Sequence, residues 1–376
     1  MRTTTNKMST VVNMLLIGLI MSSCEKSGNS FSVLSGSSSF QQSAKFEPRK
    51  LDILFVIDNS GSMSSSQQNL ANNFSSFIDR FITKGYDFKI AITTTDAYYG
   101  DQFLNYSPSN NGTPCSLCNA NQAKFRAGAG VFVITSENYD LGLNSERTRL
   151  KSDFSNNIKV GITGSGDERV FSSFKAALDS PLNIGFHRPD AFLSIVIVSD
   201  EEDFSQGVGM PNPTGWSMSE SYTNPLLHPV ISYKTYLEKF TSGKASNDFS
   251  VSTISIIDST CLTALGTGRK LATRYMDLAT MTGGTANSLC APFDTSLDNI
   301  SSTVATKVTA IFHLDKKPVV SSIRVIIDGV IIPESNTEGW SYDAVKNQIT
   351  IFGSIYMPNA GSSIIINFDP DLTGGQ

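Results

Sequence analysis

Two almost continuous apolar runs constrain the fold of this chain more than any other feature of its sequence. The runs are LDILFVI, residues 51–57, and the first part of AFLSIVIVSDEED, residues 191–203. A strand with one solvated face alternates apolar and polar residues, whereas a strand covered on both faces is apolar along its whole length. Both runs therefore predict central strands of a parallel sheet that carries helices on its two faces.

Segments with helical periodicity alternate with these runs and with further strand-like segments. In residues 67–85, large apolar side chains recur at helical spacing until Gly85, a typical helix stop. Strands joined through helices of this length run parallel, so the pattern predicts a doubly wound, mostly parallel α/β sheet. The predicted strands are 51–57, 87–96, 130–135, 191–203, 249–258 and 285–290, and the predicted helices are 67–85, 168–180, 229–243, 268–284 and 294–311.

The periodicity changes near the C-terminus, where helical patterns stop. SIRVIIDGVIIPE, residues 322–334, predicts a β-hairpin with Asp328 and Gly329 at its turn. WSYDAVKNQITIF and SSIIINFDP continue the strand pattern beyond it. We therefore predict an α/β domain over residues 50–312 and a small antiparallel β-sandwich domain over residues 316–376.

The N-terminus has the features of a targeting segment. Arg2 and Lys7 precede an apolar stretch at residues 11–21, which is too short to span a bilayer as a helix. The following MSSC resembles the lipobox of bacterial lipoproteins, with Cys24 as the lipidated residue; the alternative is a plain signal peptide. The prediction is a lipoprotein signal peptide over residues 1–23 and a Ser/Gly/Gln-rich flexible tether over residues 24–49. The protein would then be lipid-anchored in the bacterial cell envelope, in the outer membrane rather than the inner.

Charge and cysteine content narrow the possible functions further. The 376-residue chain has a formal net charge of −5, and loss of residues 1–23 would leave 27 − 34 = −7. Without a run of basic residues, this charge argues against a nucleic-acid partner. An even number of cysteines after Cys24 predicts two disulfides in an exported protein. Local spacing favours Cys115–Cys118 and Cys261–Cys290, although three pairings are open and a redox dithiol is the alternative for the first pair.

Oxygen-bearing side chains gather where the predicted strands end. Asp58, Ser60 and Ser62 follow the first run, Asp200 follows the second, and Thr163 lies in the loop VGITGSGDE before a predicted helix. In an open α/β sheet, ligands bind beyond the carboxyl ends of the strands. Capping of a helix N-terminus explains one such residue but not three at alternate positions.

Mg²⁺ and similar hard cations prefer oxygen ligands in an octahedron that retains some water. We expect the three hydroxyls to ligate such an ion, Mg²⁺ or Mn²⁺, while the two aspartates hold its waters. No protein charge then contacts the ion, which keeps a strong attraction for a carboxylate from a partner. The sequence thus predicts a site that binds an acidic group.

DILFVIDNSGSM resembles the metal-ion-dependent adhesion site of von Willebrand factor A domains. The resemblance covers residues 50 to about 312 and matches at Asp58, Ser60 and Ser62, with Thr163 and Asp200 as the later elements. It implies six strands in the order 3-2-1-4-5-6, with 130–135 as an antiparallel edge. The fifth and sixth strands would be neighbours, which would explain a Cys261–Cys290 disulfide. The whole chain also resembles bacterial lipoproteins in which such a domain precedes a short β domain.

The chain departs from that family after its fourth strand, where SDEED replaces the usual TDG. A solvated acidic loop is the favoured interpretation of Glu201–Asp203, with a second cation such as Ca²⁺ as the alternative. Thr135 and Thr113 compete with Thr163 for the threonine position. Asp96, at the end of the second strand, is a further candidate for contact with metal-bound water.

Three functions remain, and the first is favoured. It is a lipid-anchored adhesion module that captures a carboxylate of a protein partner through the bound cation, with the insertion at 97–130 shaping the ligand surface. The second is a structural envelope component in which the metal only stabilises the loops. The third is a metal-dependent hydrolase, which the lack of a motif-placed base disfavours; only Glu201 or Glu202 lie close enough. We therefore expect no enzymatic activity.

Overall fold

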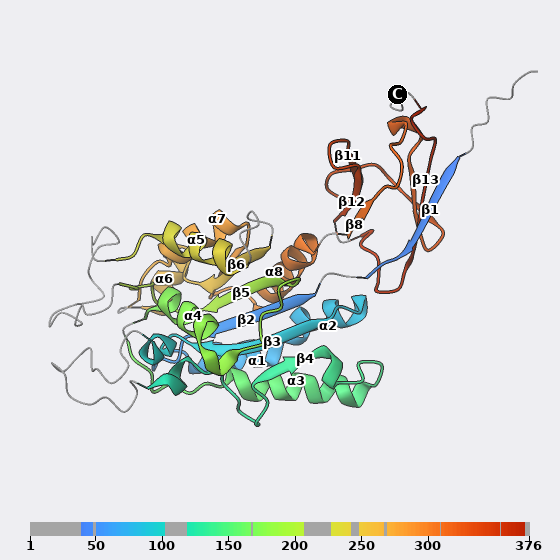
Figure 1. The fold of residues 1–376 in the computed structure, drawn as a ribbon. Coiled ribbons are helices and arrows are strands. Elements are labelled where there is room, and N and C mark those ends of the chain that lie inside the picture. Colours follow the sequence, from blue (N-terminus) through green and yellow to red (C-terminus); the bar gives the residue numbers. More distant parts are fainter. Residues whose placement is uncertain are drawn as a thin grey trace, which may run out of the picture. The chain divides into compact units, whose positions relative to one another are not determined.

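The first apolar run forms β2 (Leu51–Ile57), in the middle of a six-stranded sheet with the order β4-β3-β2-β5-β6-β7 (Figure 1). This computed structural model describes residues 39–47, 50–101, 119–166, 168–206, 227–241, 248–266, 269–308, 310–353 and 355–372. All neighbouring strands of this sheet are parallel except β4, which runs antiparallel to β3. The predicted α/β sheet, its strand order and its antiparallel edge are confirmed. The other strands are β3 (Phe88–Thr94), β4 (Val133–Thr135), β5 (Phe192–Val198), β6 (Phe249–Ser255) and β7 (Ala286–Ser288).

Helices cover both faces of this sheet, as the apolar runs require. Alternate residues of β2 contribute to two separate cores: Phe55 belongs to one, while Leu54 and Val56 belong to the other. The first core packs against α1 (Ser64–Asn73), α2 (Ser75–Lys84), α3 (Asn144–Ile158) and α8 (Phe293–Lys307). The second packs against α4 (Val170–Asp179), α5 (Val230–Phe240) and α7 (Thr273–Thr282).

Two helices lie where no element was predicted, and one predicted helix is divided. The helix α3 is polar, and its apolar contacts are few, with Leu150, Phe154 and Ile158 buried. The seven-residue α6 (Ser259–Leu265) is shorter than the usual periodicity window. The predicted helix at 67–85 becomes α1 and α2, which meet at Phe74. Short 3₁₀ turns are η1 (Ala97–Gly100), η2 (Ala120–Ala123), η3 (Ser136–Asn138), η4 (Pro181–Asn183) and η5 (Val320–Ser322).

The C-terminal strands form the predicted sandwich of two antiparallel sheets, ordered β1-β13-β9-β10 and β11-β12-β8. Asp328 and Gly329 both have positive φ, at 48° and 85°, and turn the hairpin between β9 and β10. A core that includes Trp340 and Phe368 lies between the sheets. The strands are β8 (Ala310–His313), β9 (Arg324–Ile327), β10 (Val330–Ile332), β11 (Gly339–Asp343), β12 (Gln348–Phe352) and β13 (Ser363–Phe368).

The predicted tether is wrong for part of its length, because β1 (Phe40–Lys45) is a strand of this sandwich. It pairs antiparallel with β13, and the Phe40 ring lies 5.2 Å from that of Phe368. The composition of this segment hid the strand, since only one face of it meets an apolar core. The strand β8 begins inside the range predicted for the α/β domain but pairs with β12 of the sandwich.

Several predictions fall on residues outside the described ranges. These are the signal peptide and Cys24, together with Cys115, Cys118 and Thr113. Within the described ranges, no helix combines the length and apolar character needed to cross a bilayer.

Candidate functional site

Asp58 anchors the site at the carboxyl end of β2, where the chain leaves the sheet. Its backbone N–H donates to the carbonyl of Val198, so the residue is still held against β5. Its fully buried carboxylate accepts from the backbone N–H of Ser60 at 2.8 Å and from the Ser199 hydroxyl at 2.7 Å. Burial raises the pKa of Asp58 to about 6, although these hydrogen bonds oppose the shift.

A chain of hydrogen bonds joins the first loop to the end of β5. Ser60 Oγ and Ser62 Oγ lie 3.1 Å apart, and the Ser62 hydroxyl donates to Asp200 Oδ1 at 2.9 Å. We call Asp58, Ser60, Ser62 and Asp200 the hydroxyl cluster. Helix capping does not explain it, because α1 begins after Met63 without a side-chain cap.

The spacing of the two serine oxygens suits a small, hard cation. Neighbouring ligands of an octahedral Mg²⁺ site, each about 2.1 Å from the ion, are about 3 Å apart, close to the 3.1 Å between Ser60 Oγ and Ser62 Oγ. Because the Ser62 hydroxyl gives its hydrogen to Asp200, its oxygen keeps its lone pairs. In the described part of the chain, no group of three or more His, Cys, Asp or Glu could hold a metal ion. The two serine hydroxyls are the neutral oxygens that this cluster offers to a cation.

The loop that carries Thr163 is tied to the hydroxyl cluster through its backbone. Gly164 N–H donates to the Asn59 carbonyl at 2.8 Å. The buried Gln67 amide donates both to the Asp58 carbonyl at 3.0 Å and to the Gly161 carbonyl at 2.8 Å. A Cβ on Gly164 would lie 2.5 Å from the Asn59 side chain, so the approach requires glycine.

Thr163 is exposed and directly precedes Gly164, whose N–H is bonded to the residue before Ser60. An exposed hydroxyl on this loop suits the predicted role. Its competitor Thr135 pairs with Lys89 near the amino end of β3, at the opposite end of the sheet. Of the two, only Thr163 belongs to a loop that is hydrogen-bonded to the segment carrying Ser60.

Asp96 holds two of these loops together. Its carboxylate accepts from the Asn59 amide at 3.1 Å and from the backbone N–H of Ser165 at 3.2 Å. The Thr95 hydroxyl donates to the side-chain oxygen of the same Asn59, Oδ1, at 3.1 Å. Asp96 thus positions the threonine loop, a contribution that its place after the second strand hinted at. The part played by Asn59 and Gln67 had no signal in the sequence.

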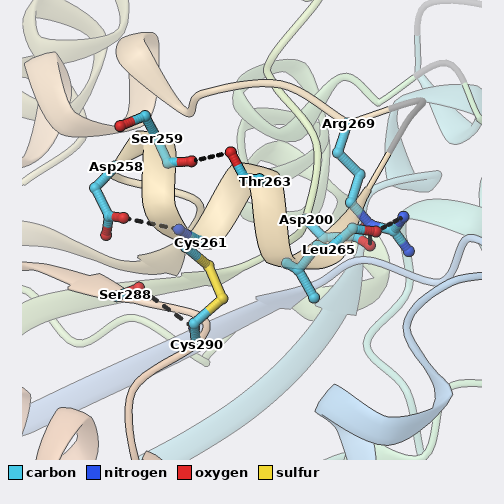
Figure 2. The surroundings of a disulfide bond; sticks show 9 residues. All are labelled: Asp200, Asp258, Ser259, Cys261, Thr263, Leu265, Arg269, Ser288 and Cys290. Atoms are coloured by element: carbon cyan, nitrogen blue, oxygen red, sulfur yellow. Dashed lines mark hydrogen bonds and ion pairs between the residues drawn. A yellow bond between two sulfur atoms is a disulfide. The ribbon is translucent and has the colours of Figure 1, made fainter.

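Arg269 contacts the hydroxyl cluster, which the sequence did not reveal. Its Nε donates to Asp200 Oδ2 at 2.6 Å, and its NH1 donates to the Leu265 carbonyl at the end of α6 (Figure 2). The same helix carries Cys261, whose disulfide to Cys290 confirms one predicted pairing. The end of α6 thus directs a positive charge onto one oxygen of Asp200, while Ser62 holds the other.

The acidic run after Asp200 is buried, which overturns the interpretation of a solvated loop. Glu202 accepts from the backbone N–H groups of Arg274 and Asp203, at 3.0 and 2.8 Å. Asp203 accepts from the Arg274 guanidinium at 3.0 Å and from the Phe171 N–H at 2.9 Å. These contacts engage oxygens of both Glu202 and Asp203 inside the protein.

Two further carboxyl groups lie close to the hydroxyl cluster. Burial, followed by the charges of Asp58 and Asp200, raises the pKa of Glu201 to about 8. Burial and the charge of Asp58 raise the pKa of Glu168 well above its usual value, and the Thr95 hydroxyl opposes the shift. Both shifts favour the neutral, protonated form of these carboxyl groups, and a cation bound nearby would favour their charged form.

Comparison with known proteins shows likeness in structure alone. No family model matches the chain, and no curated protein does. The chain is similar to proximal thread matrix protein 1 from the mussel byssus, with a TM-score of 0.36 and 14% identity over 73% of this chain and 52% of that one. It is also similar to the pilus adhesin SpaC of Lactobacillus rhamnosus GG, with a TM-score of 0.42 and 9% identity over 89% of this chain and 41% of that one. A third similar structure is the ArnB paralog VWA2 of Sulfolobus acidocaldarius, with a TM-score of 0.30 and 10% identity over 88% of this chain and 62% of that one.

The chain spans less than two thirds of the length of each of these structures. Because these TM-scores are low, the fold is identified by the order of the strands and by the antiparallel edge strand, and not by superposition on any one structure. They are the order and edge that the resemblance to von Willebrand factor A domains implies.

Proposed function

We propose that this protein is a binding module of the bacterial cell envelope that captures an acidic group of a protein partner through a divalent cation. Ser60, Ser62 and Thr163 would hold Mg²⁺ or Mn²⁺, and Asp58 and Asp200 would hold its waters. Lipid at Cys24 would attach the module to the membrane. When bound, the cation would offer a Lewis-acidic position to a carboxylate of the partner.

The arrangement of Ser60, Ser62 and Asp200 is the observation that carries this proposal. The two serine oxygens are separated by the distance expected between neighbouring ligands of Mg²⁺. The Asp200 carboxylate is hydrogen-bonded to one of these serines. Neutral ligands leave the charge of a cation largely uncompensated, so an anionic partner would be strongly attracted.

The surface beside Ser62 is open to a partner. A hollow of about 710 Å³ adjoins it, with Gln67 and Gly161 in its wall and Lys159 as the single charged residue among the described residues that line it. Ile162, 44% exposed, lies in the same wall. Such a mixture of a polar centre and an exposed apolar edge suits recognition of a protein segment.

Calorimetric titration with Mg²⁺ tests the cation site. We expect the double variant Ser60→Ala/Ser62→Ala to bind Mg²⁺ at least about ten-fold more weakly, since it removes two of three predicted ligands. Ser65→Ala, an exposed serine in the first turn of α1, is the matched control and should bind like the original protein. Equal heats for all three proteins would contradict the proposal.

Partner binding is tested separately from stability. Capture of an acidic partner should be lost in EDTA and in the double variant. If EDTA lowers only the melting temperature while capture persists, the cation has a structural role and the proposed function is wrong.

A further inference from the structure

Three basic side chains line a second hollow, which shares Lys159 with the hollow beside Ser62. Lys124, Arg126 and Lys159 surround a cavity of about 410 Å³, which we call the basic hollow. Lys159 also lines the hollow beside Ser62, so the two share a wall. Arg126 lies at the carboxyl end of β3, where its N–H donates to the Ile92 carbonyl at 2.8 Å.

The basic hollow contrasts with the charge of the whole chain. The chain has 34 acidic and 29 basic residues, yet among the described residues neither hollow has an acidic one in its lining. Within the described ranges, none of the three basic residues forms an ion pair. Lys124 instead lies 3.9 Å from the centre of the Phe132 ring. The Arg126 guanidinium makes 3.5 Å contacts with the neutral side chains of Thr94 and Gln122, and the charge of Asp96 also acts on it. Unpaired cations that share one hollow favour an anionic ligand.

The walls of the basic hollow are held in place before any ligand arrives. The buried Asn157 side chain accepts from Gly128 N–H at 2.7 Å and donates to the Val131 carbonyl at 2.6 Å. A Cβ on Gly128 would lie 2.1 Å from the Asn156 carbonyl oxygen, so the chain passes too closely for any larger residue. Fixed walls lower the ordering entropy that a ligand must overcome.

We propose that the basic hollow binds additional carboxylates of the same partner, so that the ligand is a protein segment rich in Asp and Glu. One acidic side chain would occupy the cation site, and its neighbours in sequence would contact Lys159, Lys124 and Arg126. This inference rests on the proposed function, because it extends the same binding surface. It also gives the insertion at 97–130 its role, since Lys124 and Arg126 belong to that segment.

A fluorescently labelled hexaglutamate peptide is the probe, and anisotropy in Mg²⁺ at low salt is the measurement. The test variant is Lys124→Gln/Lys159→Gln; Arg126 is left unchanged because it is partly buried. The control is Lys175→Gln/Lys346→Gln, which changes the net charge equally at lysines that already face Asp179 and Asp343. Equal melting temperatures would establish that both variants are folded.

We expect the test variant to bind hexaglutamate about five-fold more weakly, with a shallower salt dependence, and the control to bind normally. Calorimetry should give the test variant an unchanged Mg²⁺ affinity. The inference is overturned if hexaglutamate binding weakens equally in both variants or in neither. It is also overturned if the original protein does not bind hexaglutamate, or if an oligothymidylate of equal charge binds as tightly. If hexaglutamate binding persists in EDTA but falls in the test variant, the proposed cation-dependent function is refuted, while the inference that the basic hollow binds carboxylates stands.

Discussion

Arg269 Nε lies 2.6 Å from Asp200 Oδ2, and Asp200 Oδ1 accepts from Ser62 at 2.9 Å. One carboxylate therefore links a fixed positive charge to a hydroxyl that we assign to a divalent cation. With Asp58, Asp200 and Arg269 counted together, the site carries −1, and a divalent cation would bring it to +1. A partner carboxylate would then restore neutrality.

Arg269→Gln should bind Mg²⁺ more tightly than the original protein. Removal of a unit charge from beside the site relieves a repulsion of about 1–2 kcal/mol at the effective dielectric of a protein surface, which corresponds to about ten-fold in affinity. Calorimetry measures the change. Arg80→Gln, which breaks an ion pair with Asp298, is the control and should bind Mg²⁺ normally. Weaker binding by Arg269→Gln would mean that the guanidinium supports the site rather than opposing the cation.

Gly164→Ala should disturb the site, whereas Gly166→Ala should not. An added Cβ at residue 164 would meet the Asn59 side chain at 2.5 Å, but at residue 166 nothing lies within 4 Å. We expect the first variant to displace the threonine loop, to lose about 1–3 kcal/mol of stability and to bind Mg²⁺ several-fold more weakly. Denaturation and calorimetry on both variants provide the test. Unchanged Mg²⁺ affinity in Gly164→Ala would remove Thr163 from the site.

Glu202→Gln should reduce the dependence of stability on pH. Burial raises the pKa of Glu202 to about 8, above its ordinary value of 4.5. Between these values the folded protein keeps a proton that the unfolded chain releases, so the free energy of unfolding falls as pH rises through this range. The glutamine variant does not titrate, and its free energy of unfolding should fall less, by an amount on the order of a few kcal/mol.

Urea denaturation in EDTA at several pH values between about 5 and 8 measures this slope. The variant should be less stable at the acidic end by about 1–3 kcal/mol, because its amide NH₂ would face a backbone N–H. Glu238→Gln, in an ion pair with Lys234 on α5, is the control and should keep the original slope. A slope that stays the same in Glu202→Gln would show that this carboxyl is not protonated in the folded protein.

Removal of the Cys261–Cys290 disulfide should destabilise the α/β domain. The two cysteines are 29 residues apart in the chain, and a loop of this length contributes about 3 kcal/mol through the entropy of the unfolded state. Urea denaturation of Cys261→Ser/Cys290→Ser should give a free energy of unfolding lower by roughly that amount. A reductant should destabilise the original protein equally and leave the variant unchanged. Further loss in the reduced variant would assign part of the effect to Cys115 and Cys118.

The sequence predicted the α/β sheet because burial on two faces leaves a local mark. A strand such as β2 is apolar at all positions but Asp52, and the helix α2 repeats its apolar residues at helical spacing. Elements without that mark were missed. The strand β1 exposes most of one face, and α3 buries only a narrow stripe, so neither has a pattern that differs from a polar linker.

For the site, the sequence determined which oxygens could serve a cation, since Asp58, Ser60 and Ser62 lie within five residues at the end of a strand. Only the tertiary structure decided what surrounds them. Arg269 is 69 residues from Asp200, and Gln67 is 94 from Gly161. Such contacts arise from the order of strands and the packing of loops, and they leave no periodicity in the chain. Chemistry that depends on neighbours in sequence is visible in the sequence, whereas the charge that tunes it is brought by the fold.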